Sequence, residues 1–332
     1  MAGIALGTEL RKDPASGRWI LVLNEAPQLN LGDGCPFCPG NEAQTPPEIA
    51  AYRTNGQAPN SPEWQVRVIP ERVPLLRVEG NIRREAVGMF DKVSSRGASE
   101  IVIEGPDHEA SWDALPSEAV ERVLWMYRDR VEDLYRDPQI RSVIIYRRER
   151  TPADRIDHPF SRIIGAPIVF DDLRSELATA RQYFAYKHRC LYCDIVRQER
   201  RDGIRVVEET RHFSVYTPYG SRRPFETWVV PTTHSHSFED LSSDEVGDLA
   251  RTLQRTSSRL HAIQPSVPLE IVLHTGPNEA MQVGDDDWQS LPDDYHWHIE
   301  LSPDHLVHRT IGGFAVNPVP PEAAAKQLKG AI

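Results

Sequence analysis

The sequence predicts an α+β protein made of two tandem copies of one unit, each with a sheet and a long helix. Three observations support this prediction. Each half carries one Cys-x-x-Cys pair, each carries a long amphipathic helical stretch, and the turn before that stretch has the same pattern in both halves. In this turn a His follows a strand and a proline, and an aromatic residue, an acidic residue and Leu come next. Recurrence of a whole ordered pattern indicates a duplicated unit.

In the first half, alternation of apolar and polar residues predicts strands. They cover 17–24, 64–70, 98–106 and 141–149, and an amphipathic helix covers 117–137 with Ser117 as its N-cap. The stretch 35–64 is rich in proline and glycine and is predicted to be a loop. The first domain is therefore expected to span 1–175.

In the second half, a helix over 175–188 leads to the second cysteine pair. Strands are predicted over 205–219, 226–234, 269–275 and 295–302, and a second amphipathic helix over 242–263 opens with Ser and acidic residues. The second domain is expected to span 176–332.

Composition places the 332-residue chain among ordinary globular proteins, with 39% hydrophobic and 26% charged residues. No apolar run approaches the ~20 residues that span a membrane, and the start MAGIALGTELRKDP lacks the features of a secretory signal. We therefore expect a cytoplasmic protein that does not bind membranes. The formal net charge of -11 argues against a protein that coats nucleic acid.

The four cysteines form two pairs, Cys35–Cys38 and Cys190–Cys193. Without a signal peptide, metal knuckles are favoured over disulfides, and the loop-like surroundings of Cys35 argue against a thioredoxin-like redox pair. Zinc prefers four tetrahedral ligands, which are commonly thiolates and imidazoles. The duplication thus predicts two zinc ions per chain, each held by two cysteines and two histidines. The predicted ligands are Cys35, Cys38, His108 and His158 in the first half, and Cys190, Cys193, His234 and His296 in the second. A rival ligand set for the second ion is Glu176, His274, His296 and His298.

Several segments resemble one known family. They are ELRKDPASGRWI, CPFCPGNEAQTPPEI, WQVRVIPERVPLL, EIVIEGPDH, RPFETWVVPTTH and YHWHIELSP. Together they resemble the galactose-1-phosphate uridylyltransferase family of the histidine-triad superfamily, which includes ADP-glucose phosphorylase. The resemblance implies two histidine-triad domains with mostly antiparallel sheets, a homodimer, and a nucleotide or nucleotide sugar as ligand. It also implies nucleotidyl transfer by double displacement through a histidine.

The family carries its nucleophile in a His-Pro-His-x-Gln motif, and this chain departs from it. The matching stretch runs from His158 through Pro159, Phe160 and Ser161 to Arg162. The metal-type His158 is kept, but Phe160 stands at the nucleophile's position and Arg162 at that of the glutamine. A phenyl ring cannot attack phosphorus.

Three functional readings follow. In the first, an acceptor attacks the nucleotide directly while Arg162 and Arg147 stabilise the phosphoryl charge. Ser161 and Glu71 are then expected to contact the substrate. In the second, catalysis moves to the other half, where alternation along a strand places His296, His298 and Glu300 on one face; His298 is the nucleophile and Glu300 its companion. In the third, the chain is a non-catalytic descendant that binds a nucleotide or a partner, or performs another reaction.

Overall fold

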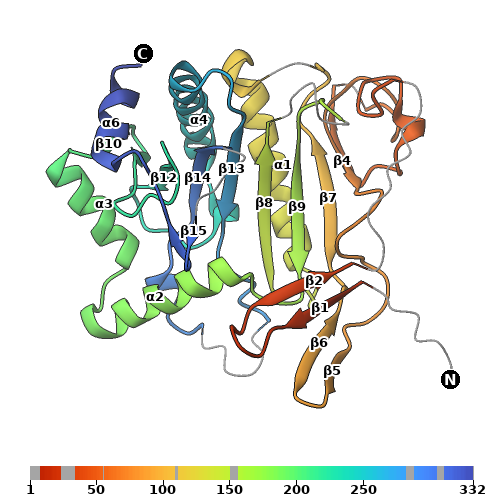
Figure 1. Ribbon diagram of the computed structural model, residues 1–332. Helices are drawn as coiled ribbons and strands as arrows, with labels where there is room; N and C mark the ends of the chain where they lie inside the picture. The colour runs from red at the N-terminus through yellow and green to blue at the C-terminus, as the bar shows by residue number, and fades with distance from the viewer. Residues whose placement is uncertain are drawn as a thin grey trace.

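The structure is a computed structural model that describes residues 8–23, 34–54, 56–108, 111–149, 156–281, 288–304 and 310–331. Its centre is a ten-stranded sheet with the order β10-β11-β12-β14-β13-β8-β9-β7-β4-β3, and the pairings within it are antiparallel (Figure 1). The first half supplies β3 (Ala50–Arg53), β4 (Trp64–Pro70), β7 (Ala98–Ile103), β8 (Ser142–Arg148) and β9 (Phe160–Ala166). The second half supplies β10 (Val206–Glu209), β11 (Phe213–Tyr216), β12 (Thr227–Pro231), β13 (Leu269–His274) and β14 (His298–Pro303).

The two halves repeat one topology, as the sequence predicts. In the first, β3, β4 and β7 precede the long helix α1 (Ser117–Tyr135), and β8 and β9 follow it. In the second, β10, β11 and β12 precede the long helix α4 (Ser243–Ile263), and β13 and β14 follow it. The halves meet where β8 pairs with β13. Equivalent strands therefore follow in the same order from each edge of the sheet to its middle: β3, β4, β7, β9 and β8 in the first half, and β10, β11, β12, β14 and β13 in the second.

The two long helices cover one face of the sheet, behind the strands in Figure 1. Their apolar stripes bury Val120, Val123 and Leu124 of α1 and Leu249 and Leu253 of α4 in one core with the inward side chains of the strands. Burial of such apolar stripes is the main force that holds a helix on a sheet. The predicted α+β duplication is therefore confirmed.

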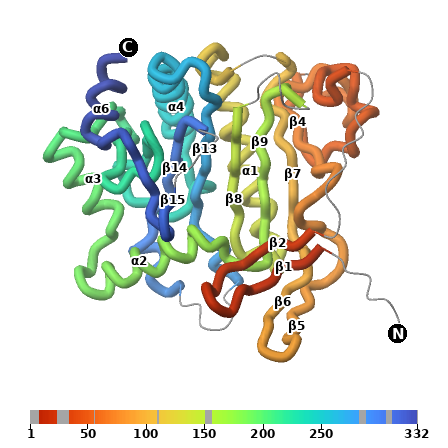
Figure 2. Tube along the Cα trace, in the orientation of Figure 1, coloured from red at the N-terminus to blue at the C-terminus, as the bar shows by residue number. Residues whose placement is uncertain are grey.

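The opposite face of the sheet carries most of the other elements (Figures 1 and 2), whereas α6 (Pro321–Lys329) packs beside α4 and buries Ala324, Ala325 and Leu328 in the same core. Helix α2 (Asp171–Lys187) crosses its lower part and leads to α3 (Leu191–Asp202). The predicted boundary at 175/176 falls inside α2, and the division into two domains stays a prediction. The remaining elements are a four-stranded sheet, a short hairpin and two helices. They are β2 (Trp19–Val22), β1 (Glu9–Lys12), β6 (Phe90–Ser94) and β5 (Arg84–Val87) in that order, β15 (Thr310–Ile311) with β16 (Phe314–Ala315), α5 (Leu291–Asp294) and α6 (Pro321–Lys329).

Local predictions differ from the structure at several places, four of which follow. Helix α1 starts at Ser117, and Pro116 is the N-cap, because its extended backbone fits that position. The predicted loop 35–64 contains β3, which lacks its own alternating pattern and forms by pairing with β4. The segment 205–219 is a hairpin of β10 and β11 rather than one strand. The last strand begins at His298, so His296 lies before it.

A partly buried polar network ties the halves together. His261 of α4 contacts Asp113 (Nδ1 to Oδ2, 3.0 Å) and Glu149 (Nε2 to Oε2, 2.9 Å), both from the first half. Hydrogen bonding to Glu149, opposed by burial, raises the pKa of His261 to about 9.

This contact predicts a loss of stability at alkaline pH. The pKa of His261 is higher in the folded state than in the unfolded state. The stability that protonated His261 contributes to the fold is therefore complete below about pH 6.5 and is lost as the pH rises through about 9. We expect the free energy of unfolding to fall by on the order of 2 kcal/mol across that window. In His261→Gln this slope should flatten, as measured by urea unfolding between pH 6 and 9.5. An unchanged slope in the variant would assign the loss to other groups.

Within the described ranges, none of the helices combines the length and apolar character that crossing a bilayer requires.

Candidate functional site

The first cysteine pair gathers with the two histidines that the duplication predicts. Ligand atoms of Cys35, Cys38, His108 and His158 all lie within 4.8 Å of one another. Cys38 Sγ lies 3.3 Å from His108 Nδ1 and 3.8 Å from His158 Nδ1. The pair sits on a tight turn in which Cys35 Sγ accepts a hydrogen bond from the Phe37 N–H at 3.4 Å.

The second cysteine pair forms an equivalent group with His234 and His296. Cys193 Sγ lies 3.4 Å from His234 Nδ1 and 3.6 Å from His296 Nδ1, and Cys190 Sγ lies 4.0 Å from His296 Nδ1. Cys190 is the N-cap of α3, so a helical turn brings Cys193 next to it.

Both groups fit a tetrahedral zinc ion. Zinc bonds of about 2.3 Å to sulfur and 2.0–2.1 Å to nitrogen place those atoms about 3.5 Å apart in a tetrahedron, close to the separations observed here. Three of the four histidines that turn Nδ1 toward a thiol also hold Nε2 with an oxygen, while His296 Nε2 is buried with no hydrogen-bond partner among the described residues. His108 Nε2 contacts Asp157 Oδ1 at 2.8 Å, His158 Nε2 the Gly105 carbonyl at 2.9 Å, and His234 Nε2 the Pro292 carbonyl at 2.7 Å. Such outer contacts fix the ring tautomer of metal-ligating histidines.

A third group lies beside the second, and it revises the rival ligand set. The side chain of His296 lies with the two cysteines of the second group. In the third group Glu300, rather than the predicted His296, lies beside Glu176, His274 and His298. The two predicted sets are therefore two separate groups rather than alternatives. The sequence gives no signal for this, since a residue two positions before the strand start is free to turn away from the strand's face.

The third group has the features of a divalent-cation site. The imidazoles of His274 and His298 stack 4.7 Å apart at 4°. Their Nε2 atoms are buried and have no hydrogen-bond partner within the described part of the chain. Glu176 Oε1 lies 3.5 Å from His274 Nδ1, and Glu300 Oε1 lies 3.9 Å from His298 Nε2. Nitrogen and carboxylate ligands together suit a first-row divalent metal.

Charge in the third group favours a bound cation. Burial raises the pKa of Glu300 to about 7, against the lowering effect of Arg222, and burial also raises the pKa of Glu176. Burial, followed by the like charge of His274, lowers the pKa of His298. A metal cation binds neutral imidazoles and deprotonated carboxylates. The charge of the cation would offset the free-energy cost of burying the two negative carboxylates.

The same geometry bears on His298 as a nucleophile. Its side chain is fully buried, stacked between His274 and the Trp228 ring at 4.8 Å. Glu300 is engaged by Arg222. A substrate phosphate does not reach His298 in this arrangement.

Phe160 lies at the start of β9 inside an apolar cluster. It is buried and meets the Phe37 ring edge-on at 5.3 Å, with Ile69, Ile101 and Ile103 around it. Phe160, which the sequence resemblance places at the nucleophile's position, is thus part of the core on this side of the sheet.

Arg162 lies two residues further on the same face of β9. Its guanidinium stacks 5.2 Å from the Phe160 ring centre, and its Nε donates to Glu71 Oε1 at 2.9 Å. These three residues line a cavity of about 60 Å³ together with Arg72. A ligand pocket commonly measures about 300–1,000 Å³, so a nucleotide requires this cavity to widen.

Arg147 and Ser161 lie on the other face of the sheet. Arg147 is 3% exposed, and its Nε donates to both carboxylate oxygens of Glu104 at 3.0 Å. Ser161 is fully buried and bonds to Glu104 and Tyr127. Alternation along a strand sends neighbouring side chains to opposite faces. These two residues therefore do not join Arg162 and Glu71, and we do not assign them a contact with substrate.

The comparisons with known proteins agree with this architecture. A family model described as galactose-1-phosphate uridyl transferase, C-terminal domain, matches residues 176–319. The chain is 25% identical to ADP-glucose phosphorylase of Arabidopsis thaliana, over 97% of this chain and 92% of that protein. It is 24% identical to galactose-1-phosphate uridylyltransferase of Thermotoga maritima, over 97% and 98% of the two chains.

Solved structures show the same fold. A uridylyltransferase mutant superposes with a TM-score of 0.78 at 26% identity, covering 97% of each chain. An ADP-glucose phosphorylase from Arabidopsis thaliana with bound ADP-glucose superposes with a TM-score of 0.73 at 24% identity, covering 97% of this chain and 98% of that one. The predicted resemblance is thus confirmed: along nearly its whole length the chain is similar in sequence and in fold to galactose-1-phosphate uridylyltransferase and ADP-glucose phosphorylase.

Proposed function

We propose that the protein is a nucleotidyltransferase-like or phosphorylase-like enzyme that acts on a nucleotide sugar or a related nucleotide. In this proposal the acceptor attacks the α-phosphorus of the nucleotide sugar directly. The bond from that phosphorus to the bridging oxygen breaks, the sugar phosphate leaves, and no covalent intermediate forms at position 160. The observation that carries it is the position of Arg162, next to the phenyl ring of Phe160 and two residues along the same face. The family's chemistry supports nucleotidyl transfer, and the phenyl ring removes the covalent step from this position.

Arg162 suits the role of phosphate ligand. A guanidinium binds phosphate through two parallel N–H bonds, and it is permanently charged. The apolar surroundings of Phe160 strengthen such a bond, because water competes less there. Glu71 holds the guanidinium at 2.9 Å before a ligand arrives. Exchange of this carboxylate for a phosphate group would open the cavity and place the phosphate beside the phenyl ring.

The alternative is a family descendant that binds a nucleotide without turning it over. The phenyl ring of Phe160, which is packed among apolar side chains and offers no nucleophile, favours this second candidate. The two differ in whether the nucleotide sugar is consumed.

Kinetics of Arg162→Ala test the enzyme proposal. A panel of nucleotide sugars is first screened by thermal shift, and turnover of any stabilising one is measured with phosphate or a sugar phosphate as acceptor. We expect kcat/KM to fall about 10²-fold in Arg162→Ala, since a charge aimed at the transferring phosphoryl group is lost. Arg211→Ala is the matched control, because Arg211 is 77% exposed and lies outside the cavity. Stabilisation without turnover would favour the binding protein.

Intact-mass analysis tests the missing intermediate. Direct displacement predicts no nucleotidylated protein after incubation with the nucleotide sugar alone, and initial-rate patterns that are not ping-pong. A labelled protein that His298→Ala abolishes would overturn this mechanism and restore the His298 reading. The homodimer and the cytoplasmic location stay predictions from the sequence and the family resemblance.

A further inference from the structure

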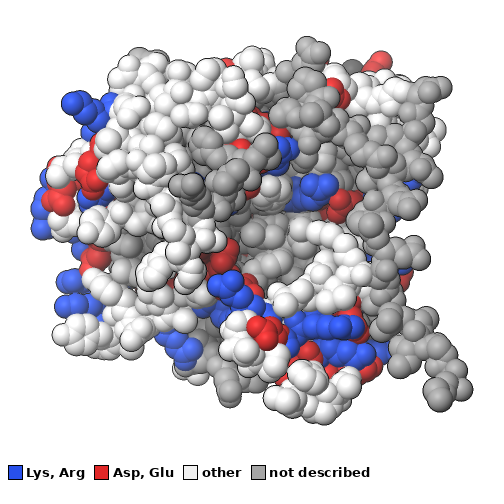
Figure 3. All heavy atoms as spheres, in the orientation of Figure 1, with Lys and Arg blue, Asp and Glu red and all other residues white. Residues whose placement is uncertain are grey.

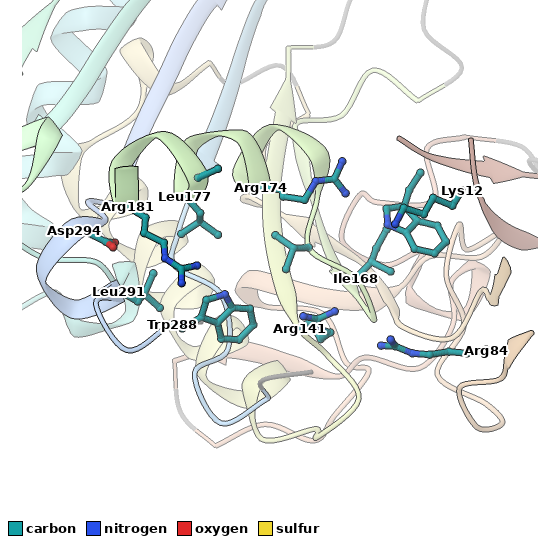
Figure 4. A pocket seen from close by; sticks show the side chains of 13 residues that line it. Lys12, Arg84, Arg141, Ile168, Arg174, Leu177, Arg181, Trp288, Leu291 and Asp294 are labelled. Atoms are coloured by element: carbon teal, nitrogen blue, oxygen red, sulfur yellow. The ribbon is translucent and has the colours of Figure 1, made fainter. Parts of the chain in front are cut away.

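A second and larger cavity lies away from Phe160. It measures about 350 Å³ and shares no lining residue with the cavity beside Arg162. Figure 4 shows that α2 forms one wall, and that β1, β2 and β5 and the segment around Trp288 form the others. The cavity therefore joins the small N-terminal sheet to the second half of the chain, and pockets often occur at such junctions.

The lining is strongly basic in a chain of net charge -11. Asp294 is its one acidic side chain among the described residues, and Asp294 already accepts a hydrogen bond from Ser290 at 2.7 Å. Five basic side chains line the cavity: Lys12, Arg84, Arg141, Arg174 and Arg181. Arg174 also pairs with Asp171 at 2.6 Å. A hollow lined mainly by one sign of charge concentrates the electric field and attracts the opposite charge.

Two indole rings hold two of these cations at the wall. The Arg141 guanidinium lies 5.6 Å from the ring centre of Trp288, which is 7% exposed. The Lys12 ammonium lies 5.9 Å from the ring centre of Trp19. The backbone N–H of Trp19 donates to the Asp171 carboxylate at 3.1 Å, which ties β2 to α2. Cation–π contacts of this kind fix positive groups without neutralising them.

In Figure 4 the guanidinium of Arg84, from β5, points toward Arg141, the residue before β8. Burial and the like charge of Arg84 lower the pKa of Arg141 to about 10. Both guanidinium groups carry a positive charge and attract an anion. Figure 3 shows Lys and Arg side chains gathered along the lower edge of the molecule, where β1 and the β5–β6 hairpin lie in Figure 1.

The rest of the lining is apolar. Ile168, Val169, Leu177 and Leu291 line it together with the two indoles. Inorganic ions make no use of such a surface, whereas a planar or hydrocarbon group gains about 25 cal/mol for each Å² that it buries. The volume matches a small organic ligand.

We propose that this cavity binds a small phosphorylated molecule of about the size of a nucleoside monophosphate. Its phosphate lies between Arg84 and Arg141, with Lys12 at the rim. Its planar or hydrocarbon part lies against Leu177 and Trp288. This site is separate from the Arg162 cavity and does not depend on the reaction proposed above.

Calorimetric titration with AMP, adenosine and inorganic pyrophosphate tests the site. The double variant Lys12→Gln/Arg84→Gln removes two positive charges from the lining. The control is Arg11→Gln/Arg83→Gln, which removes two charges from the adjacent positions outside it. We expect AMP to bind the wild type and the control alike, and the lining variant roughly tenfold or more weakly. Adenosine should bind more weakly than AMP, and pyrophosphate should compete with AMP.

Three results would overturn the proposal. They are no binding of AMP to the wild type, equal weakening in the two double variants, or loss of AMP binding in Arg162→Ala. The last result would place the ligand in the other cavity. Retention of AMP binding in Arg162→Ala keeps this site independent of the proposed function.

A further variant asks whether the chain itself supplies the anion. Asp285, Asp286 and Asp287 precede Trp288 and lie outside the described residues. Replacing all three by Asn should leave the affinity for AMP within about twofold if a soluble phosphate is the ligand. A rise of about tenfold or more would show that these carboxylates compete for the cavity, and would overturn an external ligand as its natural occupant.

Discussion

Cys190→Ser is expected to remove one zinc ion per chain and to destabilise the second half strongly. Serine is a poor zinc ligand, and the loss leaves Cys193, His234 and His296 without a complete coordination shell. Structural zinc contributes roughly 10–16 kcal/mol of apparent binding free energy in small domains. Even a part of this gives a loss on the order of 5 kcal/mol in the free energy of unfolding here.

Metal analysis and chemical unfolding measure these effects. The wild type should contain about two zinc ions per chain, one in each cysteine group. Cys35→Ser is the matched variant, because it removes the equivalent ligand from the other half. Each variant should lose one zinc ion and keep the other. If Cys190→Ser retained both zinc ions, the assignment of its group would be wrong.

If the same measurement finds a third metal ion per chain, we expect that ion to be bound by the third group, Glu176, His274, His298 and Glu300. It should survive both cysteine substitutions and disappear in His274→Ala, because His274 belongs to the group with Glu176, His298 and Glu300. A third equivalent that His274→Ala left in place would not come from this group.

Glu104→Ala is expected to cost about 3–5 kcal/mol of folding free energy. Glu104 is 2% exposed and accepts hydrogen bonds from Arg147 (Nε, 3.0 Å) and Trp112 (Nε1, 2.9 Å), and it also bonds to Ser161. The Arg147 guanidinium stacks 4.5 Å from the Trp112 ring centre and is itself buried. Removal of the carboxylate leaves this buried guanidinium with its longer contact to Glu149 at 3.4 Å, and the loss of the main partner is the costly half of a broken buried ion pair.

Guanidinium chloride unfolding checks this value. The control is Glu132→Ala, which removes a carboxylate from the exposed pair with Arg136 on α1 and should cost less than about 1 kcal/mol. The double variant Glu104→Leu/Arg147→Met should recover much of the loss, because an apolar pair needs no partner charge. Equal costs for Glu104→Ala and Glu132→Ala would contradict the view of Glu104 as the centre of a buried network.

Much of the fold could be predicted from sequence because its signals are local. The alternation in 64–70 matches β4, and the capping box of Ser242 and Glu245 marks the start of α4. Strand β3 could not be predicted, since Ala50–Arg53 forms a strand only through pairing with β4. Edge strands of this kind depend on a partner that is distant in the chain.

The candidate sites divide in the same way. The sequence alone predicted the two groups of two cysteines and two histidines, because the duplication pairs each cysteine turn with two equivalent histidines, but it left His296 open between the second group and the rival set. It also shows Phe160 at the position where the family resemblance leads one to expect a nucleophile. Only the tertiary structure decided that His296 joins the cysteines while Glu300 completes the third group, and that Arg147 and Ser161 lie in the core. The physical reason is that residue type limits which chemistry a side chain can perform. Which face it occupies depends on the start of a strand and on packing between segments that lie far apart in sequence.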